Sequence, residues 1–217
     1  MQEKLTLTQL NKAYDKLQKK YGVLGIDPIY SGGQVQNPET LFIFMNPTAA
    51  NVASSPDWKG LKAPWLGTKN IWKLFNMIRL FNDDLYQEIL SMKAVDWNPE
   101  FAIRVYEEVA RNRIYITNLA KCTQSDAKPL NNALFKEYIP LLEEEISILK
   151  PKRIVTLGNQ VSSLFLGMPI SVSKVRKKLF DREVKGTVYK VQAVYYPVGQ
   201  GMRNIGKAAE DLLANQL

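Results

Sequence analysis

The side chains best placed for chemistry in this sequence are two asparagines and a tyrosine that follow short apolar runs. Asn46 comes after LFIFM, Asn118 comes after IYIT, and Tyr196 comes shortly after an alternating run that closes at Val194. An amide carries both a hydrogen-bond donor and an acceptor, and a phenol with an ordinary pKa of about 10 donates at neutral pH. These positions suggest a site built from amides and hydroxyls.

The amino-acid composition excludes several other kinds of site. The sequence contains no histidine and one cysteine, Cys122. Mechanisms whose general base is an imidazole are therefore excluded, the Ser-His-Asp and Cys-His arrangements among them. One cysteine excludes an internal disulfide framework and cannot by itself form a zinc or iron–sulfur site. Catalysis would rest on carboxylates, amides, hydroxyls or lysines, and we expect neither a metal nor another cofactor.

Apolar runs and amphipathic stretches alternate along the chain. Continuous or alternating apolar residues predict strands over 41–45, 114–117, 154–157 and 188–194. Three- and four-residue spacing of apolar residues predicts helices over 7–21, 71–78, 83–92, 99–111, 134–149, 159–166 and 205–213. Breakers and two tryptophans predict a long loop over 49–69.

This order of elements predicts an α/β fold. We expect a three-layer αβα sandwich with a central four-stranded parallel sheet. The whole chain, 1–217, would form one domain, with an N-terminal helix and connection over 1–29 and a helical element over 82–111. Ligands bind at the carboxyl ends of parallel strands, so Asn46, Asn118 and Tyr196 are expected to meet at one edge of the sheet.

The charge of the chain indicates a polyanionic partner. With a net charge of +8 and a pI near 9.4, lysine and arginine side chains could neutralise the phosphates of a nucleic acid, although charge that only keeps a protein soluble is the alternative. No apolar run reaches the roughly 18 residues that span a bilayer, and the N-terminus lacks an apolar signal core. We therefore expect a cytoplasmic protein without a membrane partner. We also expect it to be a monomer.

The segments that follow the predicted strands resemble, in order, motifs of the uracil-DNA glycosylase superfamily. FMNPT is similar to the Gly-x-Asn-Pro stretch that ends the first strand in the mismatch-specific uracil/thymine branch. IYITNLAKCTQSDAKPLNN (114–132) and PKRIVTLGNQVSSLFLG (151–167) are similar to the Val-Thr-Asn-x-x-Lys-Cys and Pro-x-x-Ile-Val-x-Leu-Gly elements of the bacterial iron–sulfur branch. YYPVGQGMRN occupies the place of the family's Tyr-His-Pro-Ser loop, and the resemblance covers residues 30–213.

The resemblance implies roles for the residues of the base site. Enzymes of this family flip a nucleotide out of DNA and cleave the bond between sugar and base. Asn46 would orient the attacking water, and Asn118 would recognise uracil O4 and N3–H, where cytosine presents the reverse pattern. Trp65, in KAPWLGTKN, would stack on the flipped base, and Met45 would also contact it.

Each of these residues also has a purely structural interpretation. Asn46 and Pro47 form a pair that is common in turns. Asn118 would suit the N-cap of a following helix. Trp65 could instead hold a surface loop against the core.

The resemblance further implies contacts with DNA. The glycine-containing loop would approach the duplex, and Met202 or Arg203 would enter the gap left by the flipped base. The basic segment 174–178 would track phosphates, with a solvated charged face as the alternative. The residues expected to contact DNA are Lys121, Lys174, Arg176, Gly199, Gln200, Gly201, Met202 and Arg203.

Two departures from the family pattern bear on activity. The iron–sulfur branch needs four cysteines, whereas here Cys122 stands alone and Tyr138 takes the place of the next one. The family histidine that donates to uracil O2 is replaced by Tyr196, whose phenol can also donate. The mismatch-specific branch lacks this histidine as well.

These features predict a metal-independent DNA-repair glycosylase that hydrolyses the N-glycosidic bond of a flipped uracil or related damaged base. The alternative is a catalytically weak or inactive superfamily member that binds nucleic acid or a free base. A third interpretation is an unrelated nucleotide-binding α/β protein. The sequence contains no Gly-x-Gly-x-x-Gly or phosphate-loop signature that would support it. We expect Asn46, Trp65, Asn118 and Tyr196 to converge on one pocket of base size.

Overall fold

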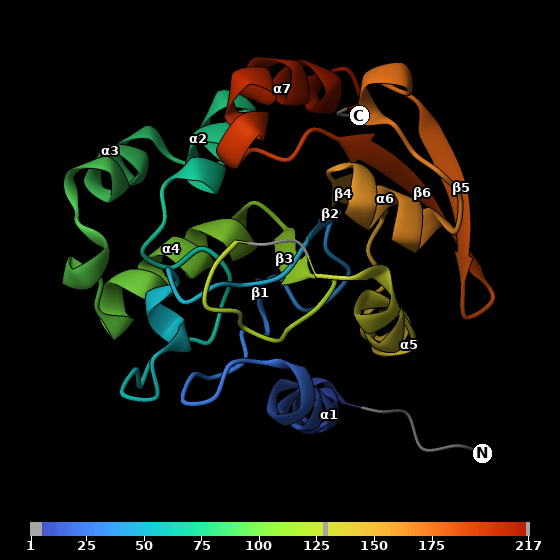
Figure 1. The fold of residues 1–217 in the computed structure, drawn as a ribbon. Helices are drawn as coiled ribbons and strands as arrows, with labels where there is room; N and C mark the ends of the chain where they lie inside the picture. Colours follow the sequence, from blue (N-terminus) through green and yellow to red (C-terminus); the bar gives the residue numbers. More distant parts are fainter. Residues whose placement is uncertain (1–5, 128–129, 216–217) are drawn as a thin grey trace.

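The fold is built on one mixed sheet. A computed structural model describes residues 6–127 and 130–215, and within them six strands are ordered β1-β3-β2-β4-β6-β5 (Figure 1). The central strands are parallel and confirm the predicted four-stranded parallel sheet; they are β3 (Ile114–Asn118), β2 (Thr40–Phe44), β4 (Arg153–Leu157) and β6 (Thr187–Val194).

The two edge strands were not predicted. Both β1 (Ser31–Gly33) and β5 (Leu179–Val184) pair antiparallel with their neighbours. Strand β1 has three residues, two of them glycine, and therefore carries no hydrophobic pattern. Strand β5 reads LFDREV and is mostly solvent-accessible, so its charges resemble those of a loop. Short and charged edges protect a sheet from pairing with other chains.

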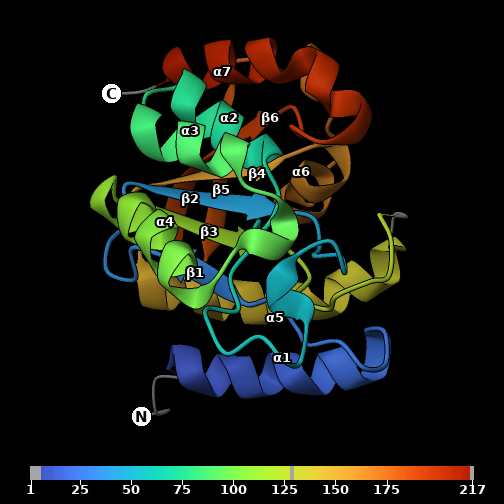
Figure 2. The same ribbon diagram turned by 90° about the vertical axis from the view of Figure 1, so that its left-hand side faces the viewer.

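Helices cover both faces of the sheet and confirm the αβα sandwich. Side chains alternate along β2, so that Phe42 and Phe44 pack on one face while Leu41 and Ile43 pack on the other. Figure 2 shows helices on opposite sides of the strands. The first face carries α2 (Asn70–Met77), α3 (Asp83–Ser91), α4 (Pro99–Arg111) and α7 (Ile205–Leu213); the second carries α1 (Leu7–Tyr21), α5 (Asn132–Leu149) and α6 (Asn159–Leu166).

Local capping sets the helix boundaries. Thr6 and Gln9 form a capping box at the start of α1, and α1 ends before Gly22, as predicted. The Asn131 side chain accepts a hydrogen bond from the Leu134 backbone, and α5 therefore begins two residues earlier than its apolar pattern indicates. Short 3₁₀ helices lie in the connections: η1 (Val52–Ser54), η2 (Ala94–Asp96), η3 (Val172–Lys174) and η4 (Gly199–Asn204). Within the described residues, no helix has the length and apolarity needed to cross a bilayer.

Parallel pairing continues past the ends of β2 and β3. Phe44 lies opposite Asn118 in the register of the two strands. Beyond it, the Leu119 N–H donates to the Phe44 carbonyl at 2.7 Å, and the Ala120 N–H donates to the Met45 carbonyl at 3.0 Å. The backbone thereby holds the residues that follow the two strands side by side.

Candidate functional site

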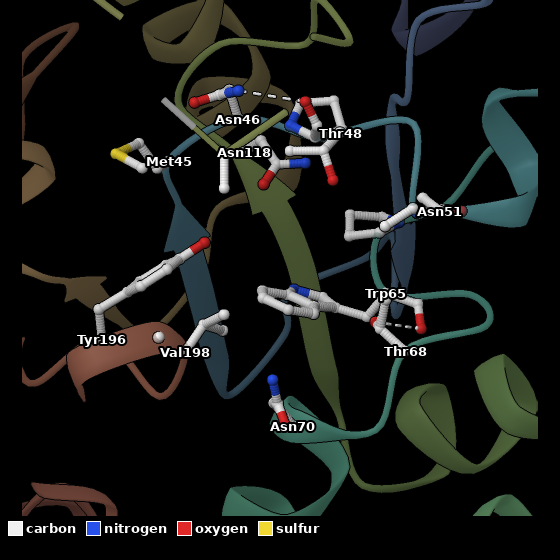
Figure 3. Close-up of a pocket in the computed structure, with 15 residues that line it drawn as sticks. Met45, Asn46, Thr48, Asn51, Trp65, Thr68, Asn70, Asn118, Tyr196 and Val198 are labelled. Atoms are coloured by element: carbon white, nitrogen blue, oxygen red, sulfur yellow. Dashed lines mark hydrogen bonds between the residues drawn. The ribbon is translucent and has the colours of Figure 1, made fainter. Parts of the chain in front are cut away.

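A pocket of about 710 Å³ lies at the carboxyl ends of the central strands (Figure 3). It brings together several residues predicted from the sequence: Met45, Asn46, Trp65, Asn118, Tyr196 and Gly199. Among the described residues that line it, none is acidic or basic. The pocket therefore offers amides, hydroxyls and aromatic rings to a ligand.

Asn46 leaves an unused acceptor in this pocket. Its Nδ2 donates to the Pro47 carbonyl at 3.1 Å, which fixes the amide in the turn. Its Oδ1 is buried and accepts no hydrogen bond from any residue that the structure describes. A buried acceptor without a partner costs about 1–3 kcal/mol, so the site favours a water or ligand donor at this atom. The turn interpretation accounts for the Nδ2 contact but not for Oδ1.

Asn118 is the last residue of β3 and is 3% exposed. Its side-chain amide points into the pocket and makes no hydrogen bond to another described residue, whereas its carbonyl accepts one from Lys121 Nζ at 2.7 Å (Figure 3). The alternative that Asn118 caps a helix is wrong, because the following helix, α5, begins only at Asn132. The amide is free to pair with a ligand.

Trp65 lies between the core and the pocket. Its ring centroid is 5.0 Å from that of Phe44 and 6.3 Å from that of Tyr196. Its backbone has a φ of 69°, a left-handed conformation that is strained for a bulky residue and occurs at ligand sites. Its buried Nε1 has no hydrogen-bond partner among the described residues. Trp65 thus holds its loop against the core and also presents an aromatic surface to the pocket.

Tyr196 supplies a neutral phenol. Its ring contacts Phe44 edge-on, at 6.1 Å between centroids, and its hydroxyl is directed into the pocket on the side of Met45 and Asn118 (Figure 3). Burial raises the pKa of this phenol well above its ordinary value. The hydroxyl therefore remains a donor throughout the neutral and mildly alkaline range.

Two glycines leave room for Tyr196. A Cβ on Gly158 would lie 3.3 Å from the Tyr196 Cβ, and Gly158 itself has a φ of 89°. A Cβ on Gly201 would lie 1.7 Å from the Tyr196 carbonyl oxygen. The loop around Tyr196 can close only with glycine at position 201.

Gly201→Ala is expected to lower the free energy of unfolding by about 1–3 kcal/mol, because the added methyl group must displace backbone atoms. Urea denaturation measures the change. Gly206→Ala is the matched control, since nothing lies within 4 Å of its added Cβ and it sits in helix α7. The control is expected to be neutral or stabilising, and equal stability of the two variants would contradict the close contact at Tyr196.

Other predicted residues do not belong to the described lining of the pocket. Lys121 is fully buried and paired with Glu145, so the prediction that it contacts DNA is wrong. Arg176 is bound to Asp211 and Glu210 at 2.9 and 2.8 Å, which occupies the group expected to reach phosphates. Lys174 is exposed, and its contact with DNA stays a prediction.

The glycine-containing loop forms the 3₁₀ helix η4 beside the pocket. Gly199 lines the pocket, Met202 is half-buried and Arg203 is exposed. Gln200 belongs to η4, but its side chain lies outside the described part of the structure. The expected DNA contacts of this loop stay predictions.

The residues around Cys122 do not fit an iron–sulfur cluster. Within 6–127 and 130–215, no group of three or more histidine, cysteine or acidic side chains could hold a metal. Cys122 is buried, which raises the pKa of its thiol, and its Sγ lies 3.6 Å from Gln124 Nε2. Tyr138 packs in the same core cluster and stacks on Tyr14, with 6.1 Å between ring centroids. Aromatic packing fills the region instead.

Sequence reasoning missed polar residues of the pocket. Thr48, Asn51, Thr68 and Asn70 also line it. Thr48 lies in FMNPT, Thr68 and Asn70 lie in KAPWLGTKN, and Asn51 lies in the predicted loop 49–69, so the signal was present in segments that the sequence already marks. Asn51 is used structurally, since its Nδ2 donates to the Ala63 carbonyl and its Oδ1 accepts from the Ala53 N–H.

Comparison with known proteins identifies the family of this chain. The family model for the uracil DNA glycosylase superfamily matches residues 13–212. The chain is also similar to a type-4 uracil-DNA glycosylase from Pyrobaculum aerophilum, with 27% identity over 93 residues, which is 41% of this chain and 47% of that protein. The match thus spans about half the length of this relative. Because the family model covers nearly the whole chain, the protein belongs to the uracil DNA glycosylase superfamily.

Proposed function

We propose that this protein is a DNA glycosylase that removes a flipped uracil or related damaged base by hydrolysis, without a metal. The observation that carries the proposal is the buried Oδ1 of Asn46, which no described residue pairs, in a pocket that also holds the Asn118 amide, likewise without a described partner. In this role Asn46 Oδ1 accepts a hydrogen bond from the water that attacks C1′ of the deoxyribose. The water oxygen bonds to C1′ as the C1′–N1 bond breaks, the electron pair of that bond leaves with the base, and the proton lost by the water passes to the departing base or to solvent.

The amide of Asn118 suits recognition of the uracil edge. Its NH₂ group can donate to O4 while its carbonyl oxygen accepts from N3–H. Trp65 offers a stacking surface, and stacking of a base on an aromatic side chain contributes about 1–3 kcal/mol. Met45 completes the base site. Together these groups would hold a flipped base in place of its lost partner.

The leaving base acquires negative charge, and the pocket offers a donor for it. Preorganised donors at the position where charge develops are a major source of catalysis. The hydroxyl of Tyr196 takes this role in place of the family histidine. DNA would be held by exposed cations such as Lys174 and Arg203.

A direct assay separates this function from its alternative. Oligonucleotides that carry one uracil, single-stranded and paired with guanine or adenine, are incubated with the protein, and abasic sites are revealed by alkaline cleavage. Abasic-site formation supports the glycosylase. None of the described residues that line the pocket is acidic, and the sequence contains no histidine, which favours the alternative of a binding protein. Tight binding of these oligonucleotides without cleavage would establish that alternative.

Tyr196→Phe is expected to lower the excision rate about 10-fold, since one hydrogen bond to the leaving base is lost while ring packing is kept. Tyr195→Phe is the matched control, because the neighbouring phenol does not line the pocket. Single-turnover rates measure both.

The pH dependence of the same reaction gives a second check. The folded-state pKa of Tyr196 is raised, so its donor is fully present below the ordinary value and is lost only at still higher pH. The difference between wild type and Tyr196→Phe is therefore expected to stay constant from pH 6 to about 9. Equal rates for the two proteins would exclude the hydroxyl from catalysis.

A further inference from the structure

A fully buried ion pair contacts the backbone of Asn118, a residue of the pocket lining. Lys121 is 0% exposed, and its Nζ is 3.0 Å from Oε2 of Glu145, which is 1% exposed. Burial of a charged pair is costly unless each hydrogen-bonding group is satisfied. Burial alone lowers the pKa of Lys121, and Glu145 opposes that effect. The proposed chemistry does not use either charge directly.

The contacts of Lys121 connect it to the site. Its ammonium group has three donors, and they reach Glu145, the Thr117 hydroxyl and the Asn118 carbonyl, the last at 2.7 Å. The nitrogen also lies 5.0 Å from the centroid of the Tyr14 ring. All three donors are therefore used in one geometry.

Glu145 is fixed from several elements at once. Its carboxylate accepts hydrogen bonds from the hydroxyls of Tyr14, Tyr115 and Thr117, each at 3.0 Å. These residues belong to α1 and β3, while Glu145 belongs to α5. The position of the Lys121 ammonium is thus determined by three secondary-structure elements.

Asn118 depends on this support. Its side-chain amide has no hydrogen-bond partner among the described residues, so only its backbone and packing orient it. Two hydrogen bonds hold that backbone. The Leu119 N–H donates to the Phe44 carbonyl, and Lys121 Nζ donates to the Asn118 carbonyl. The next helix, α5, begins only at Asn132 and does not stiffen the chain at Asn118.

We propose that Lys121, held by Glu145, is a positioning residue that fixes the Asn118 backbone so that its amide faces the base. This inference rests on the proposed function of the pocket. Lys121 acts through Asn118 and does not touch the base or the DNA. A displacement of about 1 Å in a positioning group can lower a rate by about 10²-fold.

The test removes both charges together, because a single change would leave the other charge buried and unpaired. In Lys121→Met with Glu145→Gln, the glutamine oxygen can still accept from tyrosine hydroxyls. The excision rate at saturating DNA is expected to fall about 10- to 100-fold, with unchanged affinity for undamaged duplex. Arg182→Met with Glu143→Gln is the matched control. It removes another ion pair of α5, and neither of these two residues lines the pocket. This control is expected to keep the wild-type rate.

Two further measurements separate positioning from a general loss of structure. In an Asn118→Ala background the double change is expected to cause no further loss of rate, because Lys121 acts through the Asn118 side chain. The second measurement is NMR of the Asn118 side-chain amide. In wild type its resonance is expected to be that of a rigid group. In Lys121→Met with Glu145→Gln, the charge-free variant, it is expected to be that of a mobile group. A wild-type excision rate in the charge-free variant overturns the proposal. A further loss of rate when the double change is added to Asn118→Ala overturns it as well. If the wild-type protein excises no base, the proposed function fails, and the resonance alone then decides the positioning role.

Discussion

Asn46→Ala is expected to lower the rate of uracil excision by about 10²- to 10³-fold, the usual cost of removing one group that acts on the transition state. The physical reason is the position of its Oδ1, which is buried at the pocket and has no hydrogen-bond partner among residues 6–127 and 130–215, while Nδ2 donates to the Pro47 carbonyl. Alanine removes the acceptor for the water and leaves the pocket otherwise intact. Single-turnover excision from a uracil-containing duplex measures the effect.

The matched control for this change is Asn11→Ala. Asn11 lies on α1, outside the pocket lining, and alanine is a good helix former. The control is expected to keep the wild-type rate and at least the wild-type stability. DNA binding by Asn46→Ala is expected to be unchanged, because the water contact forms after the base is bound. An excision rate in Asn46→Ala within a factor of about three of wild type would exclude the water-positioning role.

Asn118→Ala is expected to lower kcat/KM for uracil excision by about 10²-fold, since two neutral hydrogen bonds of about 1–1.5 kcal/mol each are lost. The Asn118 amide makes no hydrogen bond to another described residue and is directed into the pocket, so its hydrogen-bonding capacity is available to the ligand (Figure 3). Excision rates measured in parallel on DNA that contains uracil and on DNA that contains N3-methyluracil test this recognition. Wild type is expected to discriminate strongly against the methylated base, which lacks the N3–H donor.

In Asn118→Ala that discrimination is expected to shrink, because the acceptor for N3–H is absent in the variant. Asn11→Ala again serves as the control and is expected to discriminate as wild type does. If Asn118→Ala slows both substrates by the same factor, then Asn118 contributes to stability or general positioning and not to recognition of the base edge.

The parallel sheet and the location of the pocket could be predicted from the sequence. Runs such as LFIFM and IYIT are continuous and apolar because strands at the centre of this fold are buried on both faces. Once strands and helices alternate, the carboxyl ends of the strands must share one edge. Asn46, Asn118 and Tyr196 were placed together by this rule alone, and the structure brings them to one pocket.

The edge strands could not be predicted in the same way. Strand β1 has no side-chain pattern over its serine and two glycines, and it exists because β3 offers it an open edge. Strand β5 is charged, and its pairing with β6 determines its extended conformation more than its own composition does. In both cases long-range hydrogen bonds decide the conformation, and a local pattern does not contain them.

What the sequence by itself determined is the set of groups available for chemistry: amides, phenols and indoles, with no imidazole and with one thiol. What only the tertiary structure decided is how each polar group is used. Lys121 and Asn118 lie in the same short motif, yet one is buried in an ion pair with Glu145 and the other faces the pocket. The physical reason is that the partners of Lys121 come from α1, α5 and β3, and only folding brings these elements into contact.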